Sequence, residues 1–204
     1  MIALYGGTFN PVHEGHIALA REVRDAFELE SVEFLPSYLP VHRDVPEVSA
    51  EMRKKLLEIA LDPYPELKLN CDEINRQGAS FAIDTLQFIS EKFPQQALCW
   101  LMGVDAFNNF LSWKKPLGIL QLANLIVCAR PGVQLDNTIL PMHHLQDSAS
   151  LKNHKAGKIV FYSMQPNNCS STEIRMFLKQ GKSVSGCLSL PVLEFIHRHN
   201  LYTN

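Results

Sequence analysis

The chain has 204 residues, of which 46% are hydrophobic and 20% are charged. A chain of this length can bury a core without disulfide or metal staples, and its composition excludes a disordered chain, a coiled coil and a collagen-like repeat. Nineteen Lys and Arg against 21 Asp and Glu give a formal charge of -2, too balanced for a protein that coats nucleic acid or an acidic membrane surface. An anionic ligand must therefore be met by local cations.

The first residues lack the basic start and apolar stretch of a signal peptide, and no run approaches the ~20 apolar residues that a membrane span needs. We therefore expect a cytoplasmic protein that binds neither nucleic acid nor membrane. The five cysteines form no CxxC pair, and their odd number and scattered spacing predict reduced thiols rather than a disulfide framework. Cys99 and Cys128 lie in apolar runs and are predicted to fill the core.

Short apolar runs rich in β-branched or aromatic residues predict strands over 2–5, 32–35, 67–69, 97–102, 125–129 and 159–162. Between them, apolar residues recur at helical spacing: Leu19, Val23, Ala26 and Phe27, then Leu56, Ile59 and Ala60, then Ala82, Leu86, Ile89 and Phe93. This alternation predicts an α/β fold with a Rossmann-like, doubly wound parallel sheet and helices on both faces. Ligands are expected beyond the carboxyl ends of the strands, in the loops after Tyr5, Leu35, Met102 and Ala129.

The range 131–157 has the weakest pattern and is predicted to be a surface loop or insertion rather than a domain linker. One strand and two helices follow it. The first helix is expected to start near Ser171 and stop at Gly181, and the second to carry Pro191 in its first turn. We therefore expect a single domain over 1–204 with a small C-terminal helical extension.

The first predicted strand runs into Gly6-Gly7-Thr8-Phe9-Asn10-Pro11 and then into a helix. Glycines let backbone N–H groups approach a phosphate closely, and the start of a helix favours negative charge. Neither the Walker pattern GxxxxGK[ST] nor the dinucleotide pattern GxGxxG is present. Phosphates are expected here, held in a different way.

His13 and His16 are three residues apart at the predicted helix start, so both can face the same side. Gly15 between them removes a side chain that would crowd a bound nucleotide. A metal pair is one interpretation, but HxxH lacks the Glu and the i,i+4 spacing of the zinc helix motif. Core or capping histidines are a second. Donors to phosphate are the third, and this role suits the glycine turn best.

A second anion site is predicted at 170–175. Ser170 and Glu173 have capping-box spacing, so a helix should start there with hydroxyls and unpaired N–H groups at its positive end. Arg175 falls in the first turn, where a planar guanidinium can grip phosphate oxygens. The alternative is plain capping with a solvated arginine.

The segment GGTFNPVHEGH resembles the (T/S)xGH signature of the nucleotidylyltransferase superfamily, and it is most similar to bacterial nicotinate mononucleotide adenylyltransferases. Further segments follow in the order of that family and cover nearly the whole chain: VHR at 41–43, RQGASFAIDTL at 76–86, MGVD at 102–105 with Trp113 downstream, ARPG at 129–132 and SSTEIR at 170–175.

The resemblance implies transfer of the adenylyl group of ATP to nicotinate mononucleotide in NAD biosynthesis, with Mg²⁺ bound to ATP and no metal site made by the protein alone. It implies catalytic roles for His13, His16 and Arg175. The implied ATP-binding residues are Gly7, Thr8, Phe9, Gly15, His16, Gly103, Asp105, Arg130, Ser170, Ser171, Thr172 and Arg175. The implied mononucleotide-binding residues are His42, Arg43, Thr85, Asp105 and Trp113.

Without the resemblance, several of these residues have plainer interpretations. Trp113 would be an anchor onto the core, Asp105 a helix cap, and the basic residues at strand ends solvated loop cations. The chain also departs from the family: it has Ala79-Ser80-Phe81-Ala82 where Pro-Ser-Tyr-Thr is usual, and Leu39-Pro40-Val41-His42 where Pro-Pro-His is frequent. Both changes fall nearer the mononucleotide than ATP.

Other functions remain open at this stage. Nicotinamide mononucleotide or phosphopantetheine could be the acceptor, although phosphopantetheine would leave Trp113 and the range 131–157 unexplained. A non-catalytic nucleotide-binding regulator is the alternative of another class, and the presence of His13, His16 and Arg175 argues against it. The sequence also leaves the oligomeric state open, with a homodimer as one option.

Overall fold

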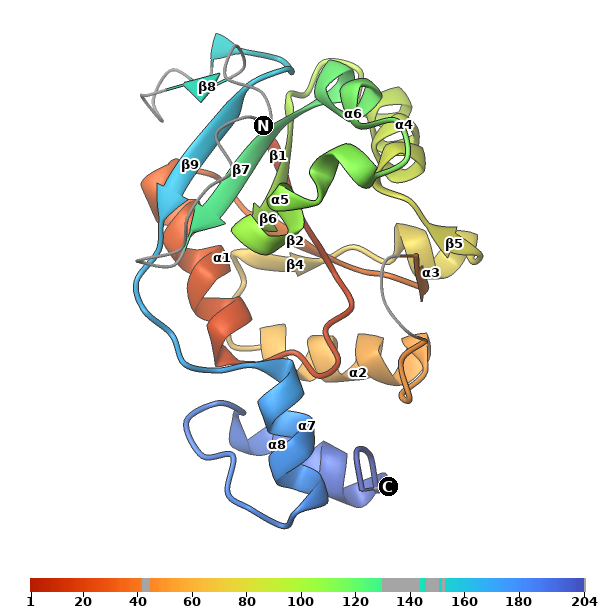
Figure 1. The fold of residues 1–204 in the computed structure, drawn as a ribbon, viewed down its shortest axis with the longest axis vertical. Helices are drawn as coiled ribbons and strands as arrows, with labels where there is room; N and C mark the ends of the chain where they lie inside the picture. The colour runs from red at the N-terminus through yellow and green to blue at the C-terminus, as the bar shows by residue number, and fades with distance from the viewer. Residues whose placement is uncertain (42–44, 130–143, 146–150, 152, 204) are drawn as a thin grey trace.

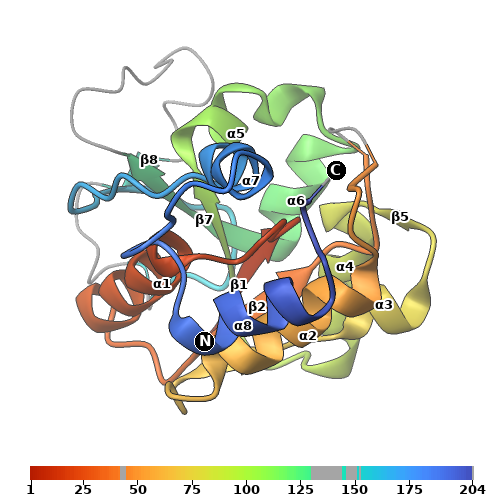
Figure 2. The same cartoon turned by 90° about the horizontal axis from the view of Figure 1, so that it is seen from below.

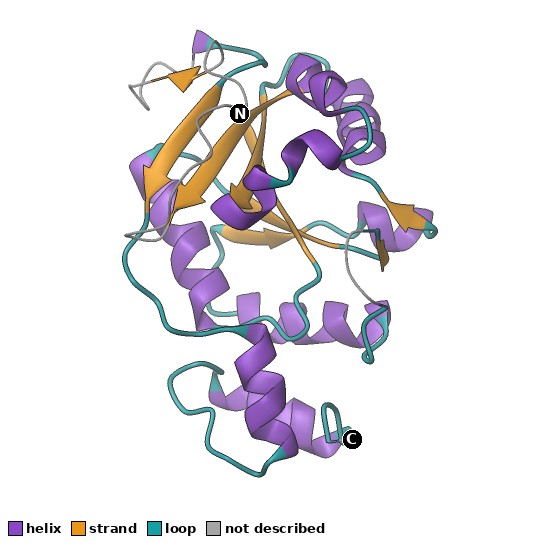
Figure 3. Cartoon of the chain, in the orientation of Figure 1, coloured by secondary structure: helices purple, strands orange, loops and turns teal. Residues whose placement is uncertain are grey.

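The computed structural model of the protein describes residues 1–41, 45–129, 144–145, 151 and 153–203. The strands are β1 (Ile2–Gly7), β2 (Val32–Pro36), β3 (Leu39–Pro40), β4 (Leu67–Leu69), β5 (Ala79–Ser80), β6 (Leu98–Gly103), β7 (Ala123–Ala129), β8 (His144–Leu145) and β9 (Ile159–Ser163). The helices are α1 (Glu14–Ala26), α2 (Ala50–Leu61), α3 (Asp72–Arg76), α4 (Ala82–Lys92), α5 (Val104–Asn108), α6 (Pro116–Leu122), α7 (Ser171–Lys179) and α8 (Leu190–Arg198), with a short 3-10 helix, η1 (Phe110–Ser112). Figures 1 and 3 show their arrangement.

The main sheet has seven strands in the order β4-β2-β1-β6-β7-β9-β8, and all its pairings are parallel. All six predicted strands belong to it. Taken in chain order, these six follow the 3-2-1-4-5-6 order of Rossmann-like sheets, so the predicted fold is confirmed. The order reverses between β1 and β6. Their carboxyl ends therefore flank the switch point at which such sheets bind ligands.

Alternate residues of each strand face opposite layers of the molecule, as the period of two requires. Phe34, Leu101 and Ile126 pack with α1, α2 and the C-terminal helices. Leu35, Trp100, Leu125 and Val127 pack with α4, α5 and α6. Because the central strands are buried on both sides, they appear in the sequence as continuous apolar runs.

The C-terminal extension consists of α7 and α8, as predicted. Gly181 (φ +64) follows the end of α7, and Pro191 lies in the first turn of α8. Val192 and Ile196 of α8 are buried in the same cluster as residues of α1 and α2. Figures 1 and 2 show α8 beside α2, with which it is in contact.

Several short elements were not predicted. β3 and β5 pair in parallel as a separate two-stranded sheet. The two residues of β8, His144 and Leu145, lie inside the range 131–157 and pair with β9. The loop prediction is therefore wrong for these two residues. Most of that range lies outside the described residues. β3, β5 and β8 have only two residues each, and α3 contains a single apolar residue, so none of them shows a hydrophobic pattern that the sequence could indicate.

The cysteines differ from expectation at one pair. Cys169 and Cys187 form a disulfide, so the prediction of reduced thiols is wrong for these two, while Cys71, Cys99 and Cys128 are free. The 18-residue separation of the pair says nothing about distance, yet folding brings the two Cα atoms to 5.4 Å. Cys99 and Cys128 are buried, as predicted, and burial raises the pKa of each thiol to about 12. Among the described residues, no helix is long and apolar enough to cross a membrane.

Candidate active site

The glycine turn ends β1 next to the end of β6. A Cβ on Gly6 would overlap the Trp100 ring, and one on Gly7 would lie 2.9 Å from Cζ of Phe9. These two glycines thus make room for aromatic rings of the chain itself, whereas close approach of a phosphate was the reason expected for them. A Cβ on Gly103, at the end of β6, would meet none of the described residues within 4 Å. Among these residues, the switch point is therefore open at Gly103.

Phe9 adopts a left-handed backbone conformation (φ +49), which is strained for a residue with a side chain. Its ring is buried, 5.4 Å from the Tyr5 ring, 5.1 Å from the His16 ring and 5.3 Å from the Phe34 ring, centroid to centroid. The Phe9 ring therefore belongs to the core. The neighbouring Thr8 and Asn10 of the turn are half-buried.

The two histidines of the turn lie on the same side, as predicted, with their rings stacked 3.6 Å apart at 25°. The backbone N–H of His13 donates to Nδ1 of His16 at 3.2 Å. Because Nδ1 accepts this bond, the proton of the neutral ring lies on Nε2, at the opposite edge. The capping role and the donor role are thus compatible, since they use different nitrogens of His16.

Gly15 is buried between the histidines and a later segment of the chain. A Cβ here would lie 2.9 Å from Oδ1 of Asn167 and 3.0 Å from Nδ1 of His13. The expectation that Gly15 leaves room for a nucleotide is therefore corrected: the chain itself fills this space. Asn167 precedes α7, so Gly15 allows the two predicted anion sites to pack closely together.

The start of α7 is bonded directly to the glycine turn. Nη1 of Arg175 donates to the carbonyl of Asn10 at 2.7 Å, and the hydroxyl of Ser171 donates to the carbonyl of Pro11 at 3.0 Å. Ser170 is the N-cap residue, but its side chain makes no capping bond, so the predicted capping box is wrong although the helix begins where expected. Two segments about 160 residues apart thus meet at one junction.

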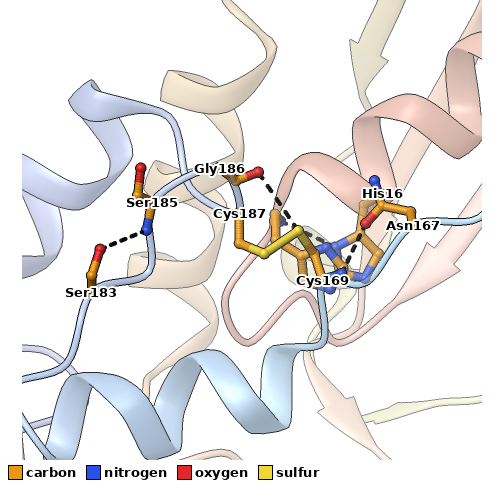
Figure 4. Close-up of a disulfide and its surroundings, with 8 residues drawn as sticks. His16, Asn167, Cys169, Ser183, Ser185, Gly186 and Cys187 are labelled. Atoms are coloured by element: carbon orange, nitrogen blue, oxygen red, sulfur yellow. Dashed lines mark hydrogen bonds between the residues drawn. A yellow bond between two sulfur atoms is a disulfide. The ribbon is translucent and has the colours of Figure 1, made fainter.

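A disulfide lies near Asn167 and the histidines of the turn (Figure 4). It joins Cys169, directly before α7, to Cys187 in the loop that leads to α8. The carbonyl of Cys187 accepts a hydrogen bond from the backbone N–H of Glu14 at 2.9 Å, and Oδ1 of Asn167 accepts from the N–H of Cys169 at 2.9 Å. The start of α1, the start of α7 and the loop before α8 are therefore held together.

Of the remaining predicted ATP residues that the structure describes, Gly103 and Asp105 lie at the end of β6 and the start of α5, and Thr172 lies at the start of α7. Asp105 is exposed in the first turn of α5, and its carbonyl accepts from Nδ2 of Asn109 at 3.0 Å. Thr172 is exposed in the first turn of α7. Arg130, like His42 and Arg43 on the mononucleotide side, lies outside the described residues.

Trp113 is half-buried and packs against the core, with its ring 6.5 Å from the Trp100 ring and 5.8 Å from the Phe110 ring. The next residue, Lys114, binds the Asp84 carboxylate at 2.9 and 3.1 Å. Its Nζ also lies 4.4 Å from the centroid of Phe81, the N-cap residue of α4. The Trp113 segment is therefore held beside the start of α4. This contact joins residues 30 positions apart, and the sequence did not indicate it.

Thr85 is fully buried, unlike a residue that touches a ligand with its side chain. Its hydroxyl donates to Oε1 of Glu73 at 2.7 Å and accepts from Nη2 of Arg76 at 3.0 Å, and its backbone N–H donates to the carbonyl of Phe81. Burial raises the pKa of the Glu73 carboxyl, and hydrogen bonds from Ser80 and Thr85 oppose that shift. Glu73 and Thr85 thus form a buried polar contact between α3 and α4, with the exposed Arg76 at its edge.

A further residue that the sequence gave no sign of is Arg53 of α2. It is 1% exposed and donates to main-chain carbonyls in the loops after both β1 and β2. No three His, Cys, Asp or Glu side chains of the described residues are grouped as a protein-made metal site requires.

The sequence matches the cytidylyltransferase-like family over residues 4–177. It is 36% identical to a probable nicotinate-nucleotide adenylyltransferase of Methylococcus capsulatus, over 99% of both chains, and 34% identical to one of Hydrogenovibrio crunogenus, over 99% of this chain and 97% of that one. The fold is similar to that of a nicotinic acid mononucleotide adenylyltransferase of Plasmodium falciparum complexed with NaAD (TM-score 0.79, 16% identity, 98% and 96% of the two chains). Because the family match spans most of the chain and the relatives are aligned over their full length, the chain belongs to the nicotinate-nucleotide adenylyltransferases of the cytidylyltransferase-like family.

Proposed function

We propose that the protein transfers the adenylyl group of ATP to nicotinate mononucleotide, which yields nicotinate adenine dinucleotide and pyrophosphate in NAD biosynthesis. The observation that carries the proposal is the junction of α7 with the glycine turn, where Arg175 binds the Asn10 carbonyl beside the stacked His13 and His16. Cationic and N–H donors converge there, at the carboxyl end of β1. The names of the full-length relatives agree with this activity.

The reaction needs positioning and charge stabilisation more than proton transfer. The phosphate oxygen of the mononucleotide attacks the α-phosphorus of ATP in line, a new P–O bond forms, and the bond to pyrophosphate breaks with its electron pair leaving on pyrophosphate. The nucleophile is already an anion, so no general base and no covalent enzyme intermediate are required.

On the ATP side, His16 donates from Nε2 to the α-phosphate, and His13 assists at the bridging oxygen. Arg175 holds the leaving pyrophosphate with the part of its guanidinium that does not bind Asn10. The hydroxyl proton of Ser171 is used by the Pro11 carbonyl, so α7 contributes its first backbone N–H groups and the Ser170 and Thr172 hydroxyls. The main chain of Gly7, Thr8, Phe9 and Gly15, with Gly103, Asp105 and Arg130, completes the ATP set.

On the mononucleotide side, Trp113 stacks on the pyridine ring, and His42, Arg43 and Asp105 bind the phosphate and sugar. The nicotinate carboxylate is placed at the start of α4, where the first N–H groups of a helix favour an anion. Because its side chain is fully buried, Thr85 does not bind the mononucleotide directly. It supports the start of α4 through its hydrogen bond to Glu73.

We propose Mg²⁺ as the ion that accompanies ATP. It would be bound by triphosphate oxygens and water, the ligands that this ion prefers when nucleotides are present. The ion would reduce the charge repulsion between ATP and the incoming phosphate. No described side chain is assigned as its ligand, and the roles given above to the residues of the chain do not depend on it.

The test is to measure pyrophosphate release from ATP with nicotinate mononucleotide, nicotinamide mononucleotide or phosphopantetheine as acceptor, and to identify the products by mass spectrometry. Release with nicotinate mononucleotide and formation of the dinucleotide are expected, with no release when the acceptor is omitted. Binding of ATP without release for any acceptor would instead identify a regulator.

A further inference from the structure

Arg53 is a buried arginine whose hydrogen bonds connect three separate loops. Nη1 donates to the Thr8 carbonyl at 2.7 Å, and Nη2 donates to the carbonyls of Ser37 at 2.7 Å and Tyr38 at 3.2 Å. Nε donates to the Val48 carbonyl at 3.2 Å, just before α2. Four of its five N–H groups thus bind main-chain carbonyls in the loops after β1, after β2 and before α2.

The two loops lie on opposite halves of the proposed site. Thr8 belongs to the glycine turn after β1, on the ATP side. Ser37 and Tyr38 follow β2, in the segment that precedes the proposed mononucleotide residues His42 and Arg43 in the sequence. The strands are paired in register up to Gly7 and Pro36, and the N–H of Ser37 donates to the Gly7 carbonyl at 2.9 Å. The strand pairing connects the two loops at their first residues. Arg53 adds a second connection between the same loops, past the ends of the strands.

The guanidinium of Arg53 can hold several loops at fixed distances from one another. A guanidinium is planar and presents its donors in a rigid fork, whereas a lysine ammonium is a single point on a flexible stem. Every hydrogen-bond acceptor that the described residues offer Arg53 is a main-chain carbonyl, so these bonds fix backbone positions directly. The residue is 1% exposed, which leaves it no direct contact with a substrate.

We propose that Arg53 is a positioning residue that sets the distance between the α-phosphorus of bound ATP and the attacking phosphate of the mononucleotide. This inference rests on the proposed function. In-line attack needs the reacting atoms about 3 to 3.5 Å apart, and a displacement of about 1 Å can lower the rate ~100-fold. Each substrate contacts mainly its own loop, so each binds normally alone. The defect after loss of Arg53 appears when both are bound.

Arg53→Lys tests this role. The lysine keeps the charge and can bind one or two of the carbonyls, but not all of them in one plane. The expected result is a kcat lowered by about 10-fold to 100-fold, with the affinity of ATP alone and of nicotinate mononucleotide alone, both measured by calorimetry, within about threefold of wild type. Lys55→Gln is the matched control: Lys55 is exposed on the same helix, where it binds Glu58 at 2.7 Å, and its replacement should leave kcat unchanged.

The calorimetric stoichiometry for ATP counts the correctly folded molecules, so kcat is expressed per competent site. An unchanged kcat per site would overturn the inference. So would weaker binding of either substrate at unchanged kcat, which would make Arg53 a determinant of affinity, or a loss of activity that disappears after this correction, which would make it purely structural. Wild-type turnover in the same assay tests the proposed function separately. Its absence would overturn that function together with the role of Arg53, whereas normal wild-type turnover with an unchanged kcat in Arg53→Lys would overturn the role of Arg53 alone.

Discussion

His16 uses the two nitrogens of its ring for different purposes. Nδ1 accepts a hydrogen bond from the backbone N–H of His13 at the start of α1. Nε2 carries the proton, and we propose that it donates a hydrogen bond to the α-phosphate of ATP. Because charge grows at the phosphorus in the transition state, His16→Ala should lower kcat by about 100-fold to 1000-fold and change KM little. Loss of the bond to His13 should lower the free energy of unfolding by only about 0.5 to 1.5 kcal/mol. Steady-state kinetics and urea denaturation measure the two effects.

His197→Ala, at an exposed position of α8, is the control and should match wild type in both measurements. Near-normal turnover of His16→Ala combined with a much lower unfolding free energy would mean that His16 is a structural residue.

Arg175 divides its guanidinium between the protein and the proposed pyrophosphate site. A lysine can keep the contact with the Asn10 carbonyl, but it loses the planar fork that binds two oxygens. Arg175→Lys should therefore raise the ATP KM and lower kcat, together by about 10-fold to 100-fold in kcat/KM, while nicotinate mononucleotide binds normally in the absence of ATP. Calorimetry with each ligand and steady-state kinetics measure this.

Lys179→Ala, at the far end of α7, is the matched control for Arg175→Lys. Equal weakening of both ligands in Arg175→Lys would indicate a general structural defect. Unchanged ATP binding and turnover would mean that Arg175 only holds α7 against the glycine turn through the Asn10 carbonyl.

At the scale of elements, α3 and α4 are joined by the buried contact of Glu73 with Thr85. Burial raises the pKa of Glu73 above its usual 4.5, so folding favours the protonated form. The resulting stability is complete below the pKa of the unfolded state and is lost as the pH rises through the pKa of the folded state. Glu73→Gln is neutral at every pH and can still accept from the Thr85 hydroxyl. Its unfolding free energy relative to wild type should therefore be higher near neutral pH than near pH 4.5.

Urea denaturation of both proteins at the two pH values gives this comparison. Asp62→Asn, at the end of α2, controls for the general effect of removing one negative charge. A difference between Glu73→Gln and wild type that does not vary with pH would contradict the assigned burial effect.

The disulfide connects the starts of α7 and α8 and closes a loop of about 18 residues. A cross-link over a loop of this length is expected to stabilise the fold by about 3 kcal/mol. Cys187→Ala, or treatment of wild type with dithiothreitol, should lower the unfolding free energy by about that amount. Weaker ATP binding should accompany it, because the bond lies directly before the α7 residues that meet the glycine turn.

Cys71→Ser, which changes a free thiol far from this pair in sequence, should behave as wild type with and without reductant. Alkylation after denaturation without reductant should label three cysteines per chain. Labelling of all five, or no response of stability to reductant, would contradict the disulfide.

At the scale of the whole molecule, the proposed pyridine site combines Trp113, the start of α4 and the support beneath it. Helix-start N–H groups form charge-assisted bonds with a carboxylate, and an amide cannot form them equally well. We therefore expect kcat/KM for nicotinate mononucleotide to exceed that for nicotinamide mononucleotide by about 10-fold to 100-fold, measured as pyrophosphate release under identical conditions. Equal values for the two acceptors would contradict this arrangement.

Much of the architecture followed from local patterns. The six main strands are apolar runs because parallel strands are buried on both faces, and the spacing of Leu56, Leu86 and Ile89 indicated helices with one buried side. The resemblance to adenylyltransferases was based on six short segments in the order of that family, from the glycine turn to SSTEIR. Each strand, helix and segment could be recognised because it depends on residues only a few positions apart.

Only the tertiary structure decided which distant groups meet. The sequence shows an arginine on α2, but its carbonyl partners are set by the way three loops pack around it. In the same way, Cys169 meets Cys187, and Gly15 makes room for Asn167 rather than for a nucleotide. Hydrophobic periodicity reports which face of an element is buried and not what it is buried against. The partners of buried polar groups are therefore fixed by packing, which a single sequence does not reveal.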